Sequence, residues 1–217
     1  MFGELSAKRI AKRTRYDIGK QTKMDNFTFL NKNFCREGQT VLLGDSITEI
    51  CNVTDFYADY TAKTGLAVYN RGISGDTSDR LLERLQDNVI SIKPKNIVLL
   101  IGTNDLGVKS GLDFTANNVR QIVRKIKSDC PNTKLILQAI YPVNKTVNPV
   151  GARKNSDIAV VNAKLKAIAE QEQIIFADFT SILSDENGRL NKAYTYDGLH
   201  PNAVGFSVTV KEILKLL

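Results

Sequence analysis

Short apolar runs alternate with segments of helical periodicity along most of the chain, and this alternation constrains the fold more than any other feature. Runs that are apolar throughout are typical of strands buried on both faces, and the stripes between them are typical of helices that pack on a sheet. Right-handed crossovers place such helices on both faces of a parallel sheet, so the pattern predicts an α/β protein with a three-layer α/β/α architecture. The expected strand cores are residues 41–43, 67–69, 97–101, 135–137 and 174–176, and the expected helices cover 81–89, 116–126, 158–168 and 206–217.

Nothing in the sequence marks a boundary between two domains. No Pro/Gly/Ser-rich linker, internal repeat or low-complexity tract interrupts the alternation, so we expect one domain over residues 1–217. Residues 1–37 precede the first strand and are expected to form a helical N-terminal extension. This extension carries a basic cluster that fits either a solvated helix face or a contact with an anionic partner. The cluster consists of Lys8, Arg9, Lys12, Arg13 and Arg15.

Composition and charge exclude several classes of protein. With 42% apolar and 24% charged residues, the chain is neither disordered nor a coiled coil. A formal charge of +7 permits weak attraction to anionic surfaces but does not imply a nucleic-acid partner. No apolar run approaches the ~20 residues of a membrane helix, so we expect a soluble, cytoplasmic protein. The cysteines Cys35, Cys51 and Cys130 lack the spacing of a disulfide framework or a zinc site, which indicates reduced thiols.

Polar residues gather at four places that the predicted topology brings together. In an open parallel sheet, ligands bind at the carboxyl ends of the strands, so the residues just after each apolar run are candidates for a functional site. The segments 44–49, 70–77 and 102–105 follow the first three strands, and the segment 197–201 precedes the last helix. We expect all four segments to lie at one rim of the sheet.

Three of these residues are a candidate nucleophile, base and acid. Ser46 follows a strand and precedes a predicted helix, which suits a nucleophile at a positive helix N-terminus but also suits a plain N-cap. His200 is the only histidine of the chain and therefore the only candidate imidazole base, although a lone histidine is more often structural. Asp197 lies three residues earlier across a glycine, where its carboxylate can accept the Nδ1 proton of His200 or simply form a turn.

Two further residues are candidate donors to an oxyanion. Gly75 could present a bare backbone N–H, and Asn104 could present a side-chain amide from the end of the third strand. A turn glycine and a loop asparagine are equally simple interpretations of these two residues. Together with the backbone N–H of Ser46 they would make three donors, each of which typically lowers the barrier of ester cleavage by roughly 3 to 4 kcal/mol.

In this order and at these strand ends, the four segments resemble the SGNH hydrolase superfamily, also called GDSL-type lipases and esterases. Ile47 stands where the name-giving pattern has Leu, which is a small departure between two apolar residues. The G-x-S-x-G motif of the α/β-hydrolases is absent. The matching blocks are Gly44-Asp45-Ser46 for the nucleophile, Gly75 for the glycine block, Gly102-x-Asn104-Asp105 for the asparagine block, and Asp197-x-x-His200 for the acid and base.

The resemblance implies a flavodoxin-like sheet of five parallel strands and a serine esterase that needs no metal or organic cofactor. It implies Ser46 as the nucleophile, His200 as general base and then general acid, and Asp197 as the residue that orients His200. The oxyanion hole would consist of the Ser46 and Gly75 amides and the Asn104 side chain.

Block spacing and compact length look most similar to the platelet-activating-factor acetylhydrolase-like and carbohydrate acetylesterase branches of the superfamily. That similarity favours a short acyl group, acetyl above all, on a small ester that is an acetylated sugar or is lipid-like. A lysophospholipase or thioesterase with the same residues stays open as an alternative. Loops carry specificity in such folds, and the candidate pocket residues are Asp45, Asp105, Tyr141 and Pro142.

Two other classes compete with the esterase hypothesis. A metal-dependent phosphoesterase could use the acidic residues of the rim as Mg²⁺ ligands, but it would leave Ser46, Asn104 and His200 unexplained. A non-catalytic binding module could keep the fold and use the basic N-terminal segment as its contact surface. The acidic residues in question are Asp45, Asp76, Asp105 and Asp197.

Overall fold

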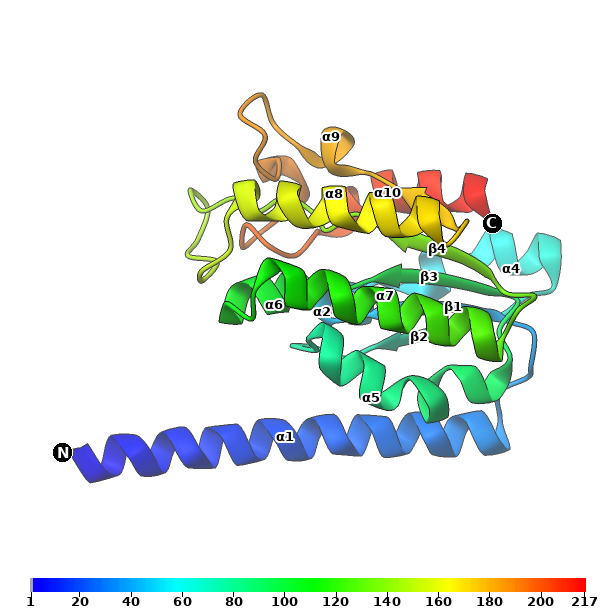
Figure 1. Ribbon diagram of the computed structural model, residues 1–217, viewed down its shortest axis with the longest axis horizontal. Coiled ribbons are helices and arrows are strands. Elements are labelled where there is room, and N and C mark those ends of the chain that lie inside the picture. The colour runs from blue at the N-terminus through cyan, green and yellow to red at the C-terminus, as the bar shows by residue number, and fades with distance from the viewer. Residues whose placement is uncertain (1) are drawn as a thin grey trace.

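A sheet of five parallel strands lies at the centre of the protein, with helices on both faces (Figure 1). This computed structural model describes the backbone of residues 2–217 and the side chains from residue 17 onward. The strand order β2-β1-β3-β4-β5 is that of a flavodoxin-like sheet, so the predicted three-layer fold class is confirmed. The strands are β1 (Thr40–Gly44), β2 (Val68–Gly72), β3 (Asn96–Leu100), β4 (Lys134–Gln138) and β5 (Ile175–Ala177).

The strands bury apolar side chains in two cores, one on each face of the sheet. Successive residues of a strand alternate between the cores, so that Leu43 packs in one and Leu42 in the other. Helices α5, α7 and α8 close the first core, and α4, α9 and α10 close the second. The longer helices are α1 (Phe2–Asn33), α5 (Ser78–Asn88), α7 (Leu112–Asp129), α8 (Asn155–Gln171) and α10 (Ala203–Leu216), and the shorter ones are α2 (Ser46–Glu49), α3 (Val53–Phe56), α4 (Ala58–Thr64), α6 (Thr103–Val108) and α9 (Thr180–Leu183), with 3₁₀ turns at Ile90–Ile92 and Lys192–Tyr194.

Helix α1 runs along the outside of α5 (Figure 1). The Asn88 side chain of α5 donates hydrogen bonds to the Met24 carbonyl and the Thr28 hydroxyl, both at 3.0 Å. The guanidinium of Arg71, in β2, lies 4.8 Å from the centre of the Phe27 ring. The predicted basic cluster of residues 8–15 lies outside the side chains that the structure describes. The division of the chain into one domain and an extension stays a prediction.

Strand β2 differs from the sequence-based expectation because it continues to Gly72, so that residues 70–72 lie in the strand and not in the loop after it. Their polar side chains obscured the strand in the sequence. Asn70 donates to the Thr48 carbonyl at 2.7 Å, and Arg71 donates to the Asn31 side chain of α1 at 2.7 Å. Both polar residues of this edge strand therefore find hydrogen-bond partners on neighbouring elements.

The chain order of the sheet reverses between β1 and β3, and this switch point is where open α/β sheets bind ligands. Gly44 at the end of β1 pairs with Leu100 at the end of β3. A Cβ at Gly44 would lie 2.2 Å from the Thr48 hydroxyl and 2.3 Å from the Leu100 carbonyl. The glycine is therefore needed for α2 to fold back closely over the end of β1.

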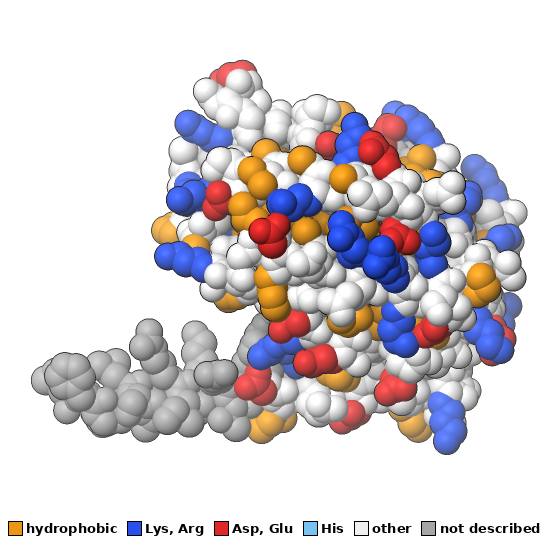
Figure 2. Space-filling view, in the orientation of Figure 1, with side chains coloured by type: hydrophobic (Ala, Val, Ile, Leu, Met, Phe, Trp, Pro, Cys, Tyr) orange, Lys and Arg blue, Asp and Glu red, His pale blue; other side chains and the backbone are white. Residues whose placement is uncertain are grey.

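The surface over α7 and α8 carries basic and acidic side chains side by side (Figure 2). Lys164 pairs with Asp113 at 2.9 Å, and Arg124 pairs with Glu172 at 2.7 Å. This face does not offer the unbroken basic patch that a nucleic-acid site requires. The expectation that nucleic acid is not a partner stays a prediction. Among the helices of the described residues, none has the length and apolar character needed to cross a bilayer.

Candidate active site

Ser46 is the first residue of α2 and lies at the carboxyl end of β1, at the switch point of the sheet. The preceding Asp45 accepts a hydrogen bond from the backbone amide of Ile47 at 3.0 Å and is therefore the N-cap of this turn. Because Asp45 takes that role, the Ser46 hydroxyl is left to face the rim. The alternative interpretation of Ser46 as the N-cap residue is thus not what the structure shows.

The structure brings Ser46, His200 and Asp197 into one hydrogen-bonded series. The Ser46 hydroxyl lies 2.9 Å from Nε2 of His200, and Nδ1 of His200 lies 2.6 Å from the Asp197 carboxylate. The serine and the histidine are 154 positions apart in the chain, so only the tertiary fold joins them. A carboxylate on Nδ1 favours the tautomer in which Nε2 is unprotonated and can accept the serine proton.

The loop that carries Asp197 and His200 is fixed by hydrogen bonds to the acid itself. One oxygen of the Asp197 carboxylate accepts from the backbone amides of Leu199 at 2.9 Å and His200 at 2.8 Å, which leaves the other oxygen for the imidazole. Burial opposes the charge of Asp197, but the hydrogen bonds from His200 and Leu199 outweigh it and lower the pKa of this carboxyl. Glycine is required at position 198, between Asp197 and His200, because its φ is +77° and a Cβ there would lie 2.2 Å from the Asn144 carbonyl oxygen.

The three predicted oxyanion donors lie at the ends of β1, β2 and β3. Within the described residues, the backbone amides of Ser46 and Gly75 donate no hydrogen bond. Gly75 has φ of +72°, a left-handed conformation that glycine adopts without strain. Asn104 donates one Nδ2 hydrogen to the Asp76 carbonyl at 3.0 Å, which links the Asn104 side chain to the loop that carries Gly75. Their role as an oxyanion hole stays a prediction.

A buried ion-pair network anchors the loop that carries Gly75, and the sequence analysis did not find its basic members. The Asp76 carboxylate accepts from Arg84 of α5 at 2.7 Å and from Lys20 of α1 at 3.1 Å. Arg84 also donates to the backbone carbonyls at the ends of two strands, Gly44 at 3.1 Å and Arg71 at 2.9 Å. Only tertiary contacts identify these residues, because Lys20 and Arg84 lie on helices outside the four blocks.

Two of the predicted pocket residues, Asp45 and Asp105, lie beneath the rim and do not face an open cavity. Both are fully buried. Asp45 caps α2, and Asp105 accepts from the backbone amide of Ser78 at 3.0 Å and from its hydroxyl at 2.5 Å. Their contacts support a structural role in place of the predicted contact with substrate. A polar residue after a strand serves a helix start as readily as it serves a ligand, and contact of these two residues with substrate stays a prediction.

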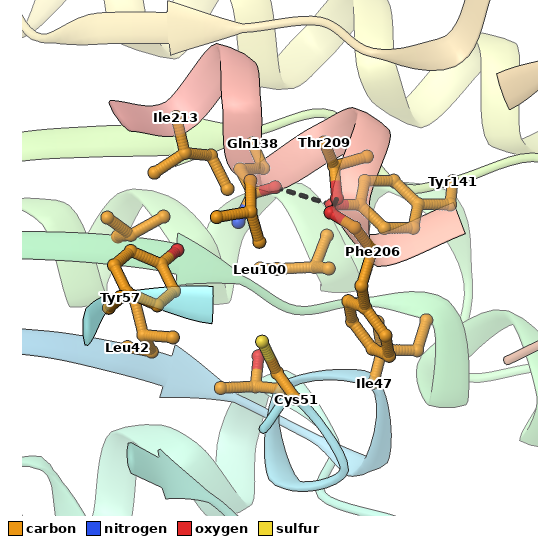
Figure 3. Close-up of a pocket in the computed structure, with 13 residues that line it drawn as sticks. Leu42, Ile47, Cys51, Tyr57, Leu100, Gln138, Tyr141, Phe206, Thr209 and Ile213 are labelled. Atoms are coloured by element: carbon orange, nitrogen blue, oxygen red, sulfur yellow. Dashed lines mark hydrogen bonds between the residues drawn. The ribbon is translucent and has the colours of Figure 1, made fainter. Parts of the chain in front are cut away.

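The other two, Tyr141 and Pro142, line different cavities. Tyr141 borders a mostly apolar cavity of about 30 Å³ between the sheet and α10, in which its hydroxyl donates to Gln138 at 2.7 Å (Figure 3). Ile47, the residue after the candidate nucleophile, also lines this cavity (Figure 3). Pro142 borders a larger cavity of about 350 Å³ beside α8. Contact of either residue with substrate stays a prediction.

No group of three His, Cys, Asp or Glu side chains among the described residues is placed to hold a metal ion. All four rim carboxylates accept hydrogen bonds from protein donors, namely Asp45 from Ile47, Asp76 from Arg84, Asp105 from Ser78, and Asp197 from His200. The rival phosphoesterase hypothesis would need several of these oxygens to turn toward one ion. That a cofactor is not needed stays a prediction.

Asp45 provides a test through the pH dependence of stability. Burial, opposed in part by the Ile47 amide, raises the pKa of Asp45 to about 7, whereas the unfolded chain releases this proton near its ordinary pKa of ~4. The folded state therefore binds the proton more tightly, and the stabilisation from protonated Asp45 is complete in acid and is lost as the pH rises toward 7 and above. Asp45→Asn cannot titrate. We expect its free energy of unfolding, relative to that of the wild type, to rise by roughly 2 to 3 kcal/mol between pH 5 and pH 8.

Urea unfolding of the wild type and of Asp45→Asn at pH 5 and at pH 8 measures this difference. Any effect of the asparagine side chain that does not depend on pH cancels when the two pH values are compared. An equal gap between variant and wild type at pH 5 and pH 8 would show that Asp45 is ionised throughout.

A hydroxyl, an imidazole and a carboxylate in series, beside amide donors at the switch point of a flavodoxin-like sheet, are the arrangement of a serine ester hydrolase. The model of the GDSL-like lipase/acylhydrolase family matches residues 42–208, which is well over half of the chain and includes all four blocks. The chain therefore belongs to this family and is a carboxylic ester hydrolase by class.

The chain is also similar to individual curated proteins and to solved structures. The chain is 27% identical to platelet-activating factor acetylhydrolase IB subunit alpha2 of Gallus gallus, over 84% of this chain and 77% of that protein. It is 29% identical to N-acylneuraminate cytidylyltransferase of Escherichia coli over 80% of this chain, but spans only 41% of that longer protein. A Streptococcus pneumonia structure named for platelet activating factor superposes with a TM-score of 0.87 at 28% identity, over 96% of this chain and 99% of that one.

Proposed function

We propose that the protein hydrolyses short-chain carboxylic esters, acetyl esters above all, through an acyl-enzyme formed on Ser46. One observation carries the proposal: Ser46, His200 and Asp197 form an unbroken series with contacts of 2.9 Å and 2.6 Å. These distances are those of hydrogen bonds, as a nucleophile, its base and the orienting acid require.

In the first half of the reaction, the Ser46 hydroxyl attacks the ester carbonyl carbon while Nε2 of His200 takes its proton. The carbonyl oxygen becomes an oxyanion, which the amides of Ser46 and Gly75 and the Asn104 side chain stabilise. Collapse of this intermediate breaks the bond to the leaving alcohol, and protonated His200 gives that alcohol its proton. The acyl group is then an ester of Ser46.

In the second half, His200 takes a proton from water as the water oxygen attacks the acyl carbon. The same donors stabilise the second oxyanion, and His200 returns the proton to the Ser46 hydroxyl as the carboxylic acid leaves. Asp197, which its hydrogen bonds keep ionised, stabilises the imidazolium in both halves. Every proton taken up is returned, so the cycle needs no other reactant than water.

Two observations support a short acyl group. The relative from Gallus gallus is named as an acetylhydrolase. The connections from β1 to α2 and from β3 to α6 are also short, so no long lid extends over Ser46 from either strand. The alcohol would belong to an acetylated sugar or a lipid-like ester. We also propose a cytoplasmic location, which the three cysteines support because none is in a disulfide.

The acyl preference can be measured with a series of p-nitrophenyl esters. We expect kcat/KM to be highest for acetate, lower for butyrate and at least about tenfold lower again for octanoate, because a longer chain needs apolar surface that a short-acyl site lacks. A maximum at octanoate would favour the lysophospholipase or thioesterase alternative. Parallel assays with acetylated xylose oligomers and with an acetylated glycerophospholipid distinguish the two sources of the acetyl group.

A second experiment separates the esterase from the two rival classes. A fluorophosphonate probe should label Ser46 stoichiometrically, and hydrolysis of p-nitrophenyl acetate should persist in EDTA. Activity on a phosphate ester that EDTA abolishes would support the metal-dependent phosphoesterase. A protein without hydrolase activity that loses a partner on deletion of residues 1–20 would be the binding module.

A further inference from the structure

Arg153 lies beside Asn104 and was not among the residues that the sequence analysis identified. It belongs to the loop of residues 139–154 between β4 and α8. Its guanidinium donates to backbone carbonyls on two sides, from Nε to Thr103 at 2.8 Å and from Nη1 to Val150 at 2.9 Å. The remaining nitrogen, Nη2, donates to Oδ1 of Asn104 at 2.7 Å. With two backbone anchors, the guanidinium is held in one orientation against the Asn104 amide.

This contact determines which end of the Asn104 amide faces the loop that carries Gly75. A guanidinium has N–H donors and no acceptor, so it can pair only with the amide oxygen. With Oδ1 held by Arg153, Nδ2 points to the Asp76 carbonyl at 3.0 Å. That bond uses one Nδ2 hydrogen and leaves the second for a ligand oxygen. In the opposite orientation a carbonyl oxygen would face the Asp76 carbonyl and would repel an oxyanion.

The space for the guanidinium exists because residue 107 is glycine. A Cβ at Gly107 would lie 2.7 Å from both Cζ and Nη2 of Arg153, which is too close for any atom there to stay in place. Gly107 lies within α6, where glycine typically costs about 0.5 to 1 kcal/mol relative to alanine. Glycine at position 107 is therefore unfavourable for α6, but a larger residue there would displace the Arg153 guanidinium.

We propose that Arg153 is a positioning residue of the reaction: it fixes Asn104 with Nδ2 toward the oxyanion, and Gly107 provides the room for it to do so. The inference rests on the proposed function, because that function gives Asn104 its role as a donor.

Kinetics of p-nitrophenyl acetate hydrolysis test the proposal with two independent variants. Arg153→Met should lower kcat about 10- to 100-fold with KM changed less than about threefold, and Arg153→Lys should recover part of this loss. Gly107→Ala should lower kcat in the same way while the melting temperature stays equal or rises, because alanine favours the helix. A merely structural role of Arg153 would not give a slower yet equally stable Gly107→Ala protein. Arg124→Met, which removes a surface arginine paired with Glu172, is the matched control and should leave kcat unchanged.

Double variants separate a failure of this inference from a failure of the proposed function. In an Asn104→Ala background, Arg153→Met and Gly107→Ala should cause no further loss of kcat, because both act through the missing amide. If Asn104→Ala itself leaves kcat unchanged, the assigned oxyanion hole is wrong. If Asn104→Ala lowers kcat but Arg153→Met and Gly107→Ala do not, or if their losses multiply with that of Asn104→Ala, the positioning role is overturned while the esterase function stands.

Discussion

Replacement of Ser46 by alanine should abolish ester hydrolysis, with kcat lowered on the order of 10⁶-fold for p-nitrophenyl acetate. The variant lacks the oxygen that forms the acyl-enzyme, and the neighbouring donors alone give only a small residual rate. Stability should change little, because Asp45 and not Ser46 caps α2, as its 3.0 Å bond to the Ile47 amide shows. Single-turnover assays and thermal unfolding measure the two effects separately.

The matched control is Ser207→Ala on α10, whose hydroxyl bonds the Val204 carbonyl of its own helix at 2.7 Å. This control should hydrolyse the ester at the wild-type rate and should still react with a fluorophosphonate, whereas Ser46→Ala should not be labelled. Turnover by Ser46→Ala above a hundredth of the wild-type rate would rule out an acyl-enzyme on Ser46.

Replacement of His200 by alanine should lower kcat roughly 10⁴- to 10⁶-fold, because the Ser46 hydroxyl then has no base and the leaving alcohol has no acid. The His200 side chain is 29% exposed, so a small base can reach the space that the substitution opens. Added imidazole should therefore restore part of the activity of His200→Ala. Rates measured over a range of imidazole concentrations test this expectation.

Imidazole should have no effect on Ser46→Ala, which keeps His200 and lacks the nucleophile. His200 is the only histidine of the chain, so diethyl pyrocarbonate should also inactivate the wild type with one modified imidazole per molecule. Full activity after that modification would show that the 2.9 Å contact between Nε2 and the Ser46 hydroxyl has no part in the reaction.

Most of the fold could be predicted from the sequence because buried strands and amphipathic helices have different periodicities. Residues 97–101 and 116–126, for example, correspond closely to β3 and α7. The expected end of β2 was wrong because Asn70 and Arg71 are polar, and their partners lie on α2 and α1. Contacts between elements distant in sequence leave no periodic signal, and so the pattern could not indicate that this strand continues.

The candidate site likewise contains residues that the sequence could indicate and residues that it could not. Ser46, Asp197 and His200 could be named because the reaction requires those side-chain types in short blocks at strand ends. Arg153 and Lys20 could not, because only the folded chain brings them near their partners, which are a side-chain amide and backbone carbonyls for Arg153 and a carboxylate for Lys20. An arginine in a loop or a lysine on a helix looks in the sequence like any solvated charge.

Among the described side chains of helix α1, Lys20 forms a buried ion pair with Asp76, in which the side chains are 9% and 3% exposed, and Lys23 pairs with Glu49 of α2. Asp76 is the next residue after Gly75, so displacement of α1 would remove one of the two cations that hold this loop and leave Arg84 as the other. Turnover should then be lost while the sheet is still intact. We therefore expect an antibody or a fusion partner that displaces α1 to slow ester hydrolysis without entering the substrate site.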